Sequence, residues 1–468
     1  MKSSNPAWRT LAWTSVAVFM ASLDATILFV AFPSIRRSFP LVSAADLSWI
    51  LNAYTVVYAA LLVPAGRIAD RVGRRRIFLQ GLAAFTLGSL ACGVAPTPPL
   101  IIAGRVVQAI GGAMLTPSSL ALVLSAFERA KWPLAVSLWA AAGALAAAVG
   151  PSAGAAIIQL GGWRWAFFVN LPVGVLALIK GRASLPDSRA LHAEGSPDVI
   201  GIALLILSVG LVALGLVKGR EWSVTPVLAC LAAGLVLLAW FVSRSRNVPA
   251  PALDLSLFRA PSFRYANAAT LVFGAAFSAM FLGGVLFLTG VWGYSTARAG
   301  LAMTPGPLIV MIVAPLGGRL AGRVGHRALL VPGGLLFGLG FLLRGVMTSA
   351  SPHYVTEWLP TVATTGIGVG LVLPSLAAAA THSLPGDSFA VGSGVNQAVR
   401  QIGSVLGVCV AIAFIGTSRG LDAMPAFTRL FFILALGGFS TAAISVVIDT
   451  RPRIRVAEQG LGIAGGNR

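Results

Sequence analysis

The chain has 468 residues, of which 57% are hydrophobic and only 10% are charged. Soluble proteins carry about 25% charged residues, so this composition excludes a soluble enzyme or binding domain and predicts a polytopic membrane protein. The formal net charge of +20 would suggest a nucleic-acid partner in a soluble protein. In a membrane protein the same excess is expected of cytoplasmic loops, so we predict no nucleic-acid partner.

Apolar runs of about 20 residues, bounded by charge, proline or glycine, predict fourteen membrane spans and an all-α fold. The first run is longer than the roughly 7–15 residues of a signal-peptide core, so we interpret it as an uncleaved span. The spans are expected near 11–33, 47–66, 77–96, 99–126, 133–158, 164–180, 198–217, 226–243, 264–291, 300–318, 328–347, 357–380, 389–417 and 426–448.

A short basic stretch, 66–76, follows the second span, and a weaker copy, 318–328, follows the tenth. A basic, glycine-bearing loop at the same point of two membrane halves is typical of a duplicated transporter. We therefore expect residues 1–180 to form an N-terminal six-helix bundle. Residues 264–468 are expected to form a C-terminal six-helix bundle with a cytoplasmic tail, and residues 181–263 to insert two further spans between the bundles.

The basic residues concentrate in alternate loops, on the side that also carries both termini. By the positive-inside rule, this predicts cytoplasmic termini and a multi-pass location in the cell inner (plasma) membrane. Arg344 is among the few basic residues assigned to the outer side. The loops are too short for an ATPase domain, and no phosphate-binding Gly-x-x-x-x-Gly-Lys-Ser/Thr sequence occurs. We therefore expect transport driven by a proton or other ion gradient, with no cofactor.

Neither the cysteines nor the histidines show the spacing of metal ligands. Cys92, Cys230 and Cys409 all lie in apolar runs, so they are expected to be free thiols that act as small hydrophobic residues. The four histidines are scattered in loops or at helix ends. The sequence therefore predicts no metal site and no enzymatic activity.

Asp24 is the acidic residue predicted to lie deep in a span. A carboxylate at this depth costs about 2.5–3.5 kcal/mol on insertion scales unless it is paired or faces water. Desolvation also makes reversible protonation feasible, which is what a proton-coupling group requires. Arg105 is the predicted partner, because the depths of the two residues differ by only about 5 Å. The alternative is an ion pair with a purely structural role.

The basic stretch 66–76 predicts a gating loop at the cytoplasmic face. Gly66 and Gly73 permit a tight turn and close helix approach, whereas the arginines, Arg71 and Arg74 among them, also satisfy the positive-inside rule. Asp70 is not explained by that rule. It is placed to face the positive N-terminal end of the span near 389–417, a contact that would latch the cytoplasmic side shut.

Two further groups lie within spans. Gly150, Pro151 and Gly154 in the fifth span permit close helix approach and a local bend, although ordinary helix packing is an equal alternative. The corresponding span of the second half carries polar residues expected to line a central cavity. They are Asn396, Gln397 and Arg400, and the deep acidic partner that Arg400 requires is missing from the second half.

Five stretches together resemble the major facilitator superfamily, and specifically its fourteen-helix drug:proton antiporter family. They are 23–33 in the first span, the loop 66–76, 105–113, Gly150-Pro151 with Gly154, and 163–172. The resemblance implies the major facilitator fold and proton-driven export of toxic small molecules. It further implies that Asp24 and Arg105 couple protons and that Asp70 gates.

We therefore expect a proton-coupled antiporter that exports drugs or other toxic small molecules by alternating access. Its expected partners are an amphipathic or cationic small molecule, protons and the lipid bilayer, and the protein is expected to be a monomer. Two alternatives remain open at this stage. The chain could export or import one dedicated metabolite, or it could be a non-transporting membrane receptor on the same fold.

Overall fold

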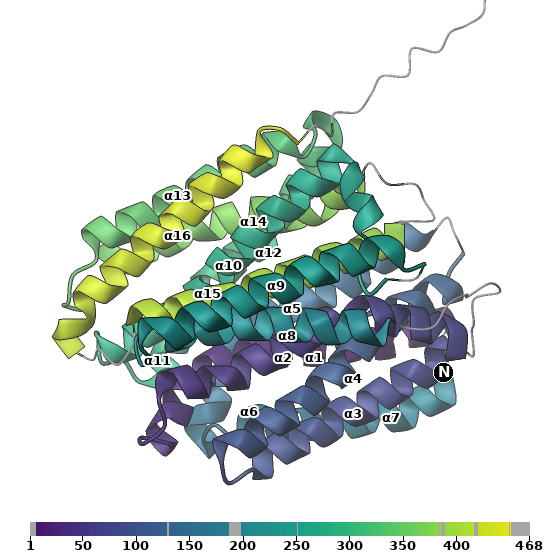
Figure 1. Ribbon diagram of the computed structural model, residues 1–468, viewed down its shortest axis with the longest axis horizontal. Coiled ribbons are helices and arrows are strands. Elements are labelled where there is room, and N and C mark those ends of the chain that lie inside the picture. The colour runs from purple at the N-terminus through teal and green to yellow at the C-terminus, as the bar shows by residue number, and fades with distance from the viewer. Residues whose placement is uncertain are drawn as a thin grey trace, which may run out of the picture.

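A computed structural model describes residues 6–128, 131–186, 198–249, 251–382, 384, 389–415, 420–448 and 450 (Figure 1). These residues form helices and no strands. The first half contains α1 (Pro6–Ser38), α2 (Ala44–Val72), α3 (Arg74–Val94), α4 (Pro98–Ala126), α5 (Trp132–Gly161), α6 (Trp165–Phe168) and α7 (Asn170–Ser184). The predicted C-terminal tail lies outside the described residues.

The remaining helices follow the predicted order. The middle pair is α8 (Val199–Lys218) and α9 (Val224–Asn247). The second half contains η2 (Leu255–Arg259), α10 (Pro261–Gly290), α11 (Thr296–Met303), α12 (Pro305–Val324), α13 (Arg327–Met347), η3 (Tyr354–Trp358), α14 (Leu359–His382), α15 (Phe389–Ile415), η5 (Gly420–Ala423) and α16 (Met424–Ser445).

Thirteen of the described helical segments are long and apolar enough to cross a membrane. Three of them combine shorter elements: α6 with α7, α11 with α12, and η3 with α14. Because α5 covers the fifth predicted span, every predicted span coincides with a helix. The predicted all-α membrane fold is confirmed, as expected for a chain whose backbone polar groups must bond internally within lipid.

The repeated basic loop has the same turn in both halves. Gly73 joins α2 to α3 at φ 124°, and Gly325 joins α12 to α13 at φ 82°. Both angles lie in the region that glycine adopts far more readily than other residues. The sequence repeat therefore places a glycine with a positive φ at the same point of each half.

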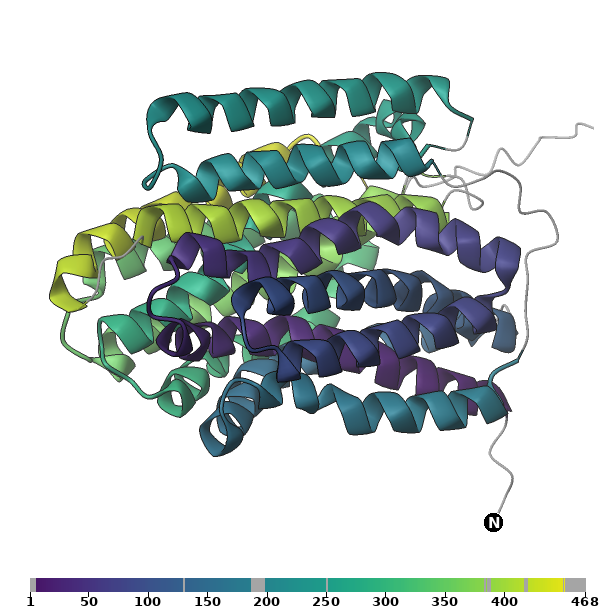
Figure 2. The same ribbon diagram turned by 60° about the horizontal axis from the view of Figure 1, so that its bottom comes forward.

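Within the first half, α1 packs on α5, and α4 packs on α2 and α3. In the second half, α10 packs on α15, and α13 lies between α14 and α16. The middle pair lies at one side of the molecule (Figure 2), where α8 contacts both α2 and α15 and α9 covers α8. The two halves meet through α2 with α15, α5 with α11 and α1 with α10.

The described ends of the chain, Pro6 and the end of α16, lie at the same end of the bundle, on the right in Figure 1. We call this end the termini face and the other end the opposite face. An even number of spans requires this arrangement. Which face is cytoplasmic stays a prediction from the distribution of basic residues.

Candidate functional site

The side chain of Asp24 lies inside the first half and has no exposed surface. Its Oδ2 accepts a hydrogen bond from Arg105 Nη1 at 2.6 Å. Its Oδ1 accepts two more, from Asn170 Nδ2 at 2.8 Å and from Gln108 Nε2 at 3.2 Å. Three side-chain donors thus hold a carboxylate that is closed off from solvent. The bond from the Arg105 guanidinium is the charge-assisted one of the three.

Arg105 is 2% exposed, and its side chain contacts residues of α1 and α2 as well as of its own helix, α4. Its Nε donates to the Ile50 carbonyl of α2 at 3.0 Å, and its Nη1 also donates to Gln108 Oε1 at 2.8 Å. The guanidinium carbon lies 4.1 Å from the centre of the Tyr54 ring. The predicted contact between Arg105 and Asp24 is therefore present, as a buried ion pair with additional donors and a cation–π contact.

Ser89 and Asn170 complete the network, and the sequence analysis assigned neither of them a role. Ser89 Oγ accepts from Gln108 Nε2 at 2.6 Å and from Asn170 Nδ2 at 3.2 Å. The network therefore joins α1, α3, α4 and α7. Gln108 was detectable, because a residue three positions after Arg105 lies on the same helical face. Ser89 carried no such local signal, and Asn170 lies in the stretch 163–172 that carries the family resemblance, which predicted no contact for it.

A row of two tyrosines leads from Arg105 to the second half. The rings of Tyr54 and Tyr58 stack with centres 5.7 Å apart. The Tyr58 hydroxyl hydrogen-bonds Thr116 Oγ1 at 2.9 Å, and it also faces Gln397 and Arg400 of α15. We call Tyr54 and Tyr58 the tyrosine row. It connects the buried ion pair to the contact between the halves.

The predicted cavity residues divide into two groups. Gln397 and Arg400 face the tyrosine row, and Arg400 Nε donates to Gln397 Oε1 at 3.1 Å. Asn396 instead turns into the second half, where its Nδ2 donates to Asn267 Oδ1 at 3.1 Å and Thr270 Oγ1 at 3.0 Å. With 6% exposure, Asn396 fixes α15 to α10 and lies apart from the tyrosine row. Sequence spacing alone did not separate these two orientations.

Gly150 and Gly154 set the contact between α5 and α1 just beyond Asp24. A Cβ atom at Gly150 would overlap the Thr26 hydroxyl, and one at Gly154 would lie 3.0 Å from Ile27 Cγ1. Pro151, which follows Gly150, lies inside α5. A Cβ added at Gly300 of α11 would lie 2.6 Å from the Pro151 carbonyl oxygen. These residues therefore bring α1, α5 and α11 into close contact.

The gating loop lies at the termini face. Asp70 Oδ1 accepts from Arg74 Nε at 2.8 Å, and the Asp70 side chain is 41% exposed. Within the described part of the chain, no hydrogen bond joins Asp70 to α15, so the predicted latch stays a prediction. Gly66 packs on Pro117 of α4, and Arg71 is exposed.

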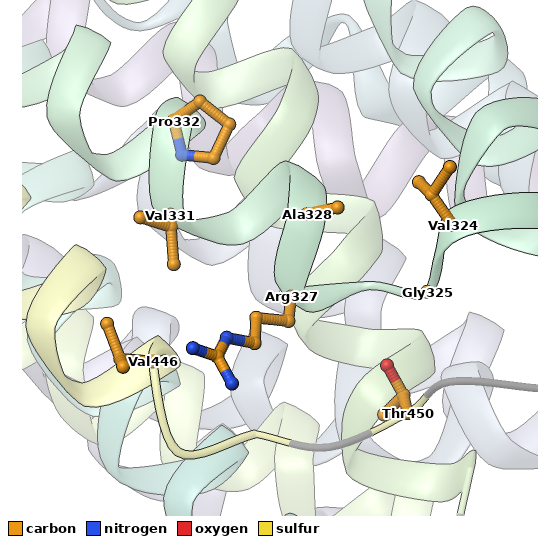
Figure 3. Close-up of a pocket in the computed structure, with 8 residues that line it drawn as sticks. All are labelled: Val324, Gly325, Arg327, Ala328, Val331, Pro332, Val446 and Thr450. Carbon is orange, nitrogen blue, oxygen red and sulfur yellow. The ribbon is translucent and has the colours of Figure 1, made fainter.

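Two surface pockets lie away from this network. The larger, about 280 Å³, opens beside the second copy of the basic loop and is drawn in Figure 3. Arg327 and Val446 extend toward it from different helices. The smaller, about 120 Å³, lies between the ends of α2, α8 and α15. Neither pocket is lined by Asn396, Gln397 or Arg400, so neither is the predicted central cavity.

A many-helix fold with a buried ion pair defines a polytopic membrane protein, and sequence comparison names its family. A profile of the Major Facilitator Superfamily matches residues 14–408. The chain belongs to the Major Facilitator Superfamily. It is therefore a membrane transporter and not an enzyme. The profile match confirms the resemblance to this superfamily stated from the motifs. Transporters of this superfamily generally use ion gradients and need no cofactor.

Several relatives carry names that refer to drug resistance or export. The multidrug resistance protein Stp of Mycobacterium tuberculosis (strain CDC 1551 / Oshkosh) is 35% identical over 407 residues, which is 86% of this chain and 74% of that protein. The tetracenomycin C resistance and export protein of Streptomyces glaucescens is 32% identical, over 89% of this chain and 77% of its own. The methylenomycin A resistance protein of Streptomyces coelicolor (strain ATCC BAA-471 / A3(2) / M145) is 31% identical, over 94% and 92%.

Solved structures support the fold alone. A bacterial homologue of the human drug peptide transporters PepT1 and PepT2 aligns with a TM-score of 0.64 at 15% identity. That alignment covers 94% of this chain and 97% of the other. A structure from work on proton dependent oligopeptide transporters aligns with a TM-score of 0.65 at 16% identity, covering 94% and 98%.

Proposed function

We propose that this protein is a proton-coupled antiporter that exports drugs or other toxic small molecules by alternating access. The observation that carries the proposal is the sealed pair of Asp24 and Arg105. When a buried carboxylate gains or loses a proton, its interactions with the side chains around it change, and this is how a proton can drive a conformational change. The names of the relatives support the direction of transport and the drug-like class of cargo.

The hydrogen-bond pattern selects the oxygen that takes the proton. Oδ1 of Asp24 already accepts from two amide groups, Asn170 and Gln108, whose donors do not depend on its charge. Oδ2 is held by Arg105 through a charge-assisted bond, which weakens when the carboxyl becomes neutral. Protonation at Oδ2 therefore releases Arg105 and leaves the amide contacts in place.

The tyrosine row gives the released arginine a route to the second half. Arg105 lies on the Tyr54 ring, Tyr54 stacks on Tyr58, and the Tyr58 hydroxyl faces Gln397 and Arg400. A guanidinium without a counterion is expected to draw closer to the electron-rich face of Tyr54 or to move toward water. Either movement shifts the tyrosine row, which lies at the contact between the halves.

The motion itself would rock the bundle 1–180 against the bundle 264–468, with the inserted pair 181–263 beside them. At the opposite face, α11 closes on α5, and Arg37 of α1 reaches Thr296 of α11 at 3.5 Å. We propose that this contact opens in the alternate state. Asp70 would then exchange Arg74 for the positive N-terminal end of α15 and latch the termini face.

The cargo is proposed to be amphipathic or cationic, because the tyrosine row supplies aromatic rings and Asp24 supplies a buried carboxylate close to them. The protein is proposed to act as a monomer in the plasma membrane, with both termini in the cytoplasm. Two relatives are named for single antibiotics, tetracenomycin C and methylenomycin A, so a dedicated exporter is the second candidate.

Inside-out vesicles that contain the protein test the proposal. An imposed proton gradient, acid inside, should drive accumulation of a fluorescent cationic dye, and collapsing the gradient with an uncoupler should stop it. A susceptibility panel in a pump-deficient host then separates the two candidates, because a dedicated exporter protects against one compound only. Specific binding of compounds without any flux would instead support a receptor and refute transport.

A further inference from the structure

The second half contains a buried arginine that the proposed transport mechanism does not use. Arg344 lies near the end of α13 at the opposite face and is 2% exposed. Its guanidinium carbon lies 4.2 Å from the Trp358 ring centre, 4.7 Å from that of Phe341 and 5.8 Å from that of Phe431. We call these three rings the aromatic box.

Arg344 differs from Arg105 in having no carboxylate beside it. Among the described residues it makes no ion pair, and its Nε donates to the neutral Thr361 Oγ1 at 2.9 Å. Glu357 directly precedes Trp358 in the chain, but its carboxylate is bound elsewhere: it accepts a hydrogen bond from Ser349 N at 2.7 Å and contacts His353 Nδ1 at 3.1 Å. A full positive charge is thus buried without an opposite charge from the described residues.

Three buried polar atoms, one of Arg344 itself, one of the box residue Trp358 and one at the end of α13, also lack a partner within the described part of the chain. They are Arg344 Nη2, Trp358 Nε1 and Thr348 Oγ1. Thr348 follows Arg344 by one helical turn. Trp292 Nε1 donates to the carbonyl oxygen of Ser349, the residue after Thr348, and the Trp292 ring centre lies 5.6 Å from that of Trp358. All three groups can donate a hydrogen bond. Buried donors are normally satisfied, and Arg344 and Trp358, whose side chains are in contact, each keep an orphaned donor beside an uncompensated charge. This indicates an acceptor with a negative charge, to which Thr348 can add a third donor.

We propose that Arg344, Trp358 and Thr348 bind one small monovalent anion, of which chloride is the most available. A single negative charge neutralises the guanidinium, and the three donors replace the hydration shell of the ion. Water can accept the same hydrogen bonds but leaves the charge uncompensated. A divalent anion would leave an excess negative charge in an aromatic environment. The position near the opposite face would admit the ion from that side, apart from the Asp24 network.

The test uses the purified full-length protein in detergent, with its melting temperature measured at fixed pH and ionic strength. Chloride or bromide replaces gluconate, a bulky monovalent anion, in steps. Wild type should show a saturable rise in melting temperature with either halide and none with gluconate. Trp358→Phe keeps the ring and removes the N–H, so the half-saturating halide concentration should rise about tenfold.

Arg298→Gln is the matched control. Arg298 is exposed near the same face, and its guanidinium lies 4.0 Å from the Tyr294 ring, so this variant removes an aromatic-bound arginine outside the site. It should keep the wild-type halide dependence. Arg344→Gln, where it folds, should lose that dependence.

The proposal is overturned if wild type melts at the same temperature in halide and gluconate, which would mean water alone occupies the box. It is equally overturned if Arg344→Gln or Trp358→Phe titrates like wild type, because the ion would then bind elsewhere on this basic protein. Anomalous scattering from a bromide-soaked crystal provides a direct readout. A peak within hydrogen-bond distance of Arg344 Nη2 supports the site, and its absence at saturating bromide refutes it.

Discussion

Asp24→Asn separates the electrostatic role of the carboxylate from its structural role. Asparagine has nearly the same shape and keeps an oxygen that accepts from Asn170 and Gln108, which donate to Oδ1 in the structure. It cannot carry a charge, so the 2.6 Å ion pair with Arg105 is lost. The variant is therefore fixed in a state close to protonated Asp24. We expect proton-driven dye accumulation in inside-out vesicles to fall to the uncoupled background.

The same substitution should also destabilise the fold by a calculable amount. Removing one member of a buried pair costs about 3–5 kcal/mol, because the remaining charge is left uncompensated. Arg105→Gln added to Asp24→Asn removes that charge, so the double variant should regain most of the lost stability. Transport should not return. Recovery of the melting temperature without recovery of coupling would distinguish the two roles of Asp24.

Asp46→Asn is the matched control. Asp46 pairs with Lys218 at 2.8 Å, but its side chain is 50% exposed, so losing the pair should cost no more than about 1 kcal/mol. Its transport should match wild type. The reasoning fails if Asp24→Asn still accumulates dye in response to the proton gradient, or if the double variant is less stable than Asp24→Asn alone.

Three further substitutions test the surroundings of the pair. Tyr54→Leu removes the cation–π contact with Arg105, worth about 0.5–2 kcal/mol, and should uncouple dye transport from the proton gradient. Tyr54→Phe keeps the ring and should retain coupling in the vesicle assay. Equal loss of coupling in both variants would exclude a role for the tyrosine row in transport. Gly150→Ala should lower stability by about 1–3 kcal/mol, because the new Cβ overlaps the Thr26 hydroxyl and lies 2.8 Å from the Thr26 Cβ. Thr26→Ala removes the hydroxyl and keeps the Cβ, so it should restore part of the melting temperature; no recovery would contradict this contact. Asp70→Asn should change stability by less than about 1 kcal/mol, because its ion pair is partly exposed, yet slow dye transport; an unchanged rate would remove the latch.

Arg105 and Arg344 are both buried arginines, but the local sequence predicted the surroundings of only the first. Arg105 was identified as the partner of Asp24 because two opposite charges at similar depth in lipid have few other ways to be compensated. The charge distribution counts Arg344 with the basic residues of the outer side, because it lies near the outer end of the span predicted over 328–347. The structure buries it among aromatic rings. Only the packing of α13, η3 and α16 places three rings around it.

The sequence by itself determined the order and extent of the apolar helices, the repeat of the basic loop and the identity of the buried pair. These features are local, because span length follows from bilayer thickness and the cost of an unpaired charge applies wherever it lies. Only the tertiary structure decided that Ser89 and Asn170 hold Asp24, that Tyr54 lies beneath Arg105, and that Asn396 turns away from Gln397. Each of these contacts joins helices far apart in the chain, and helix packing depends on side-chain shape over whole surfaces, which no short stretch of sequence records.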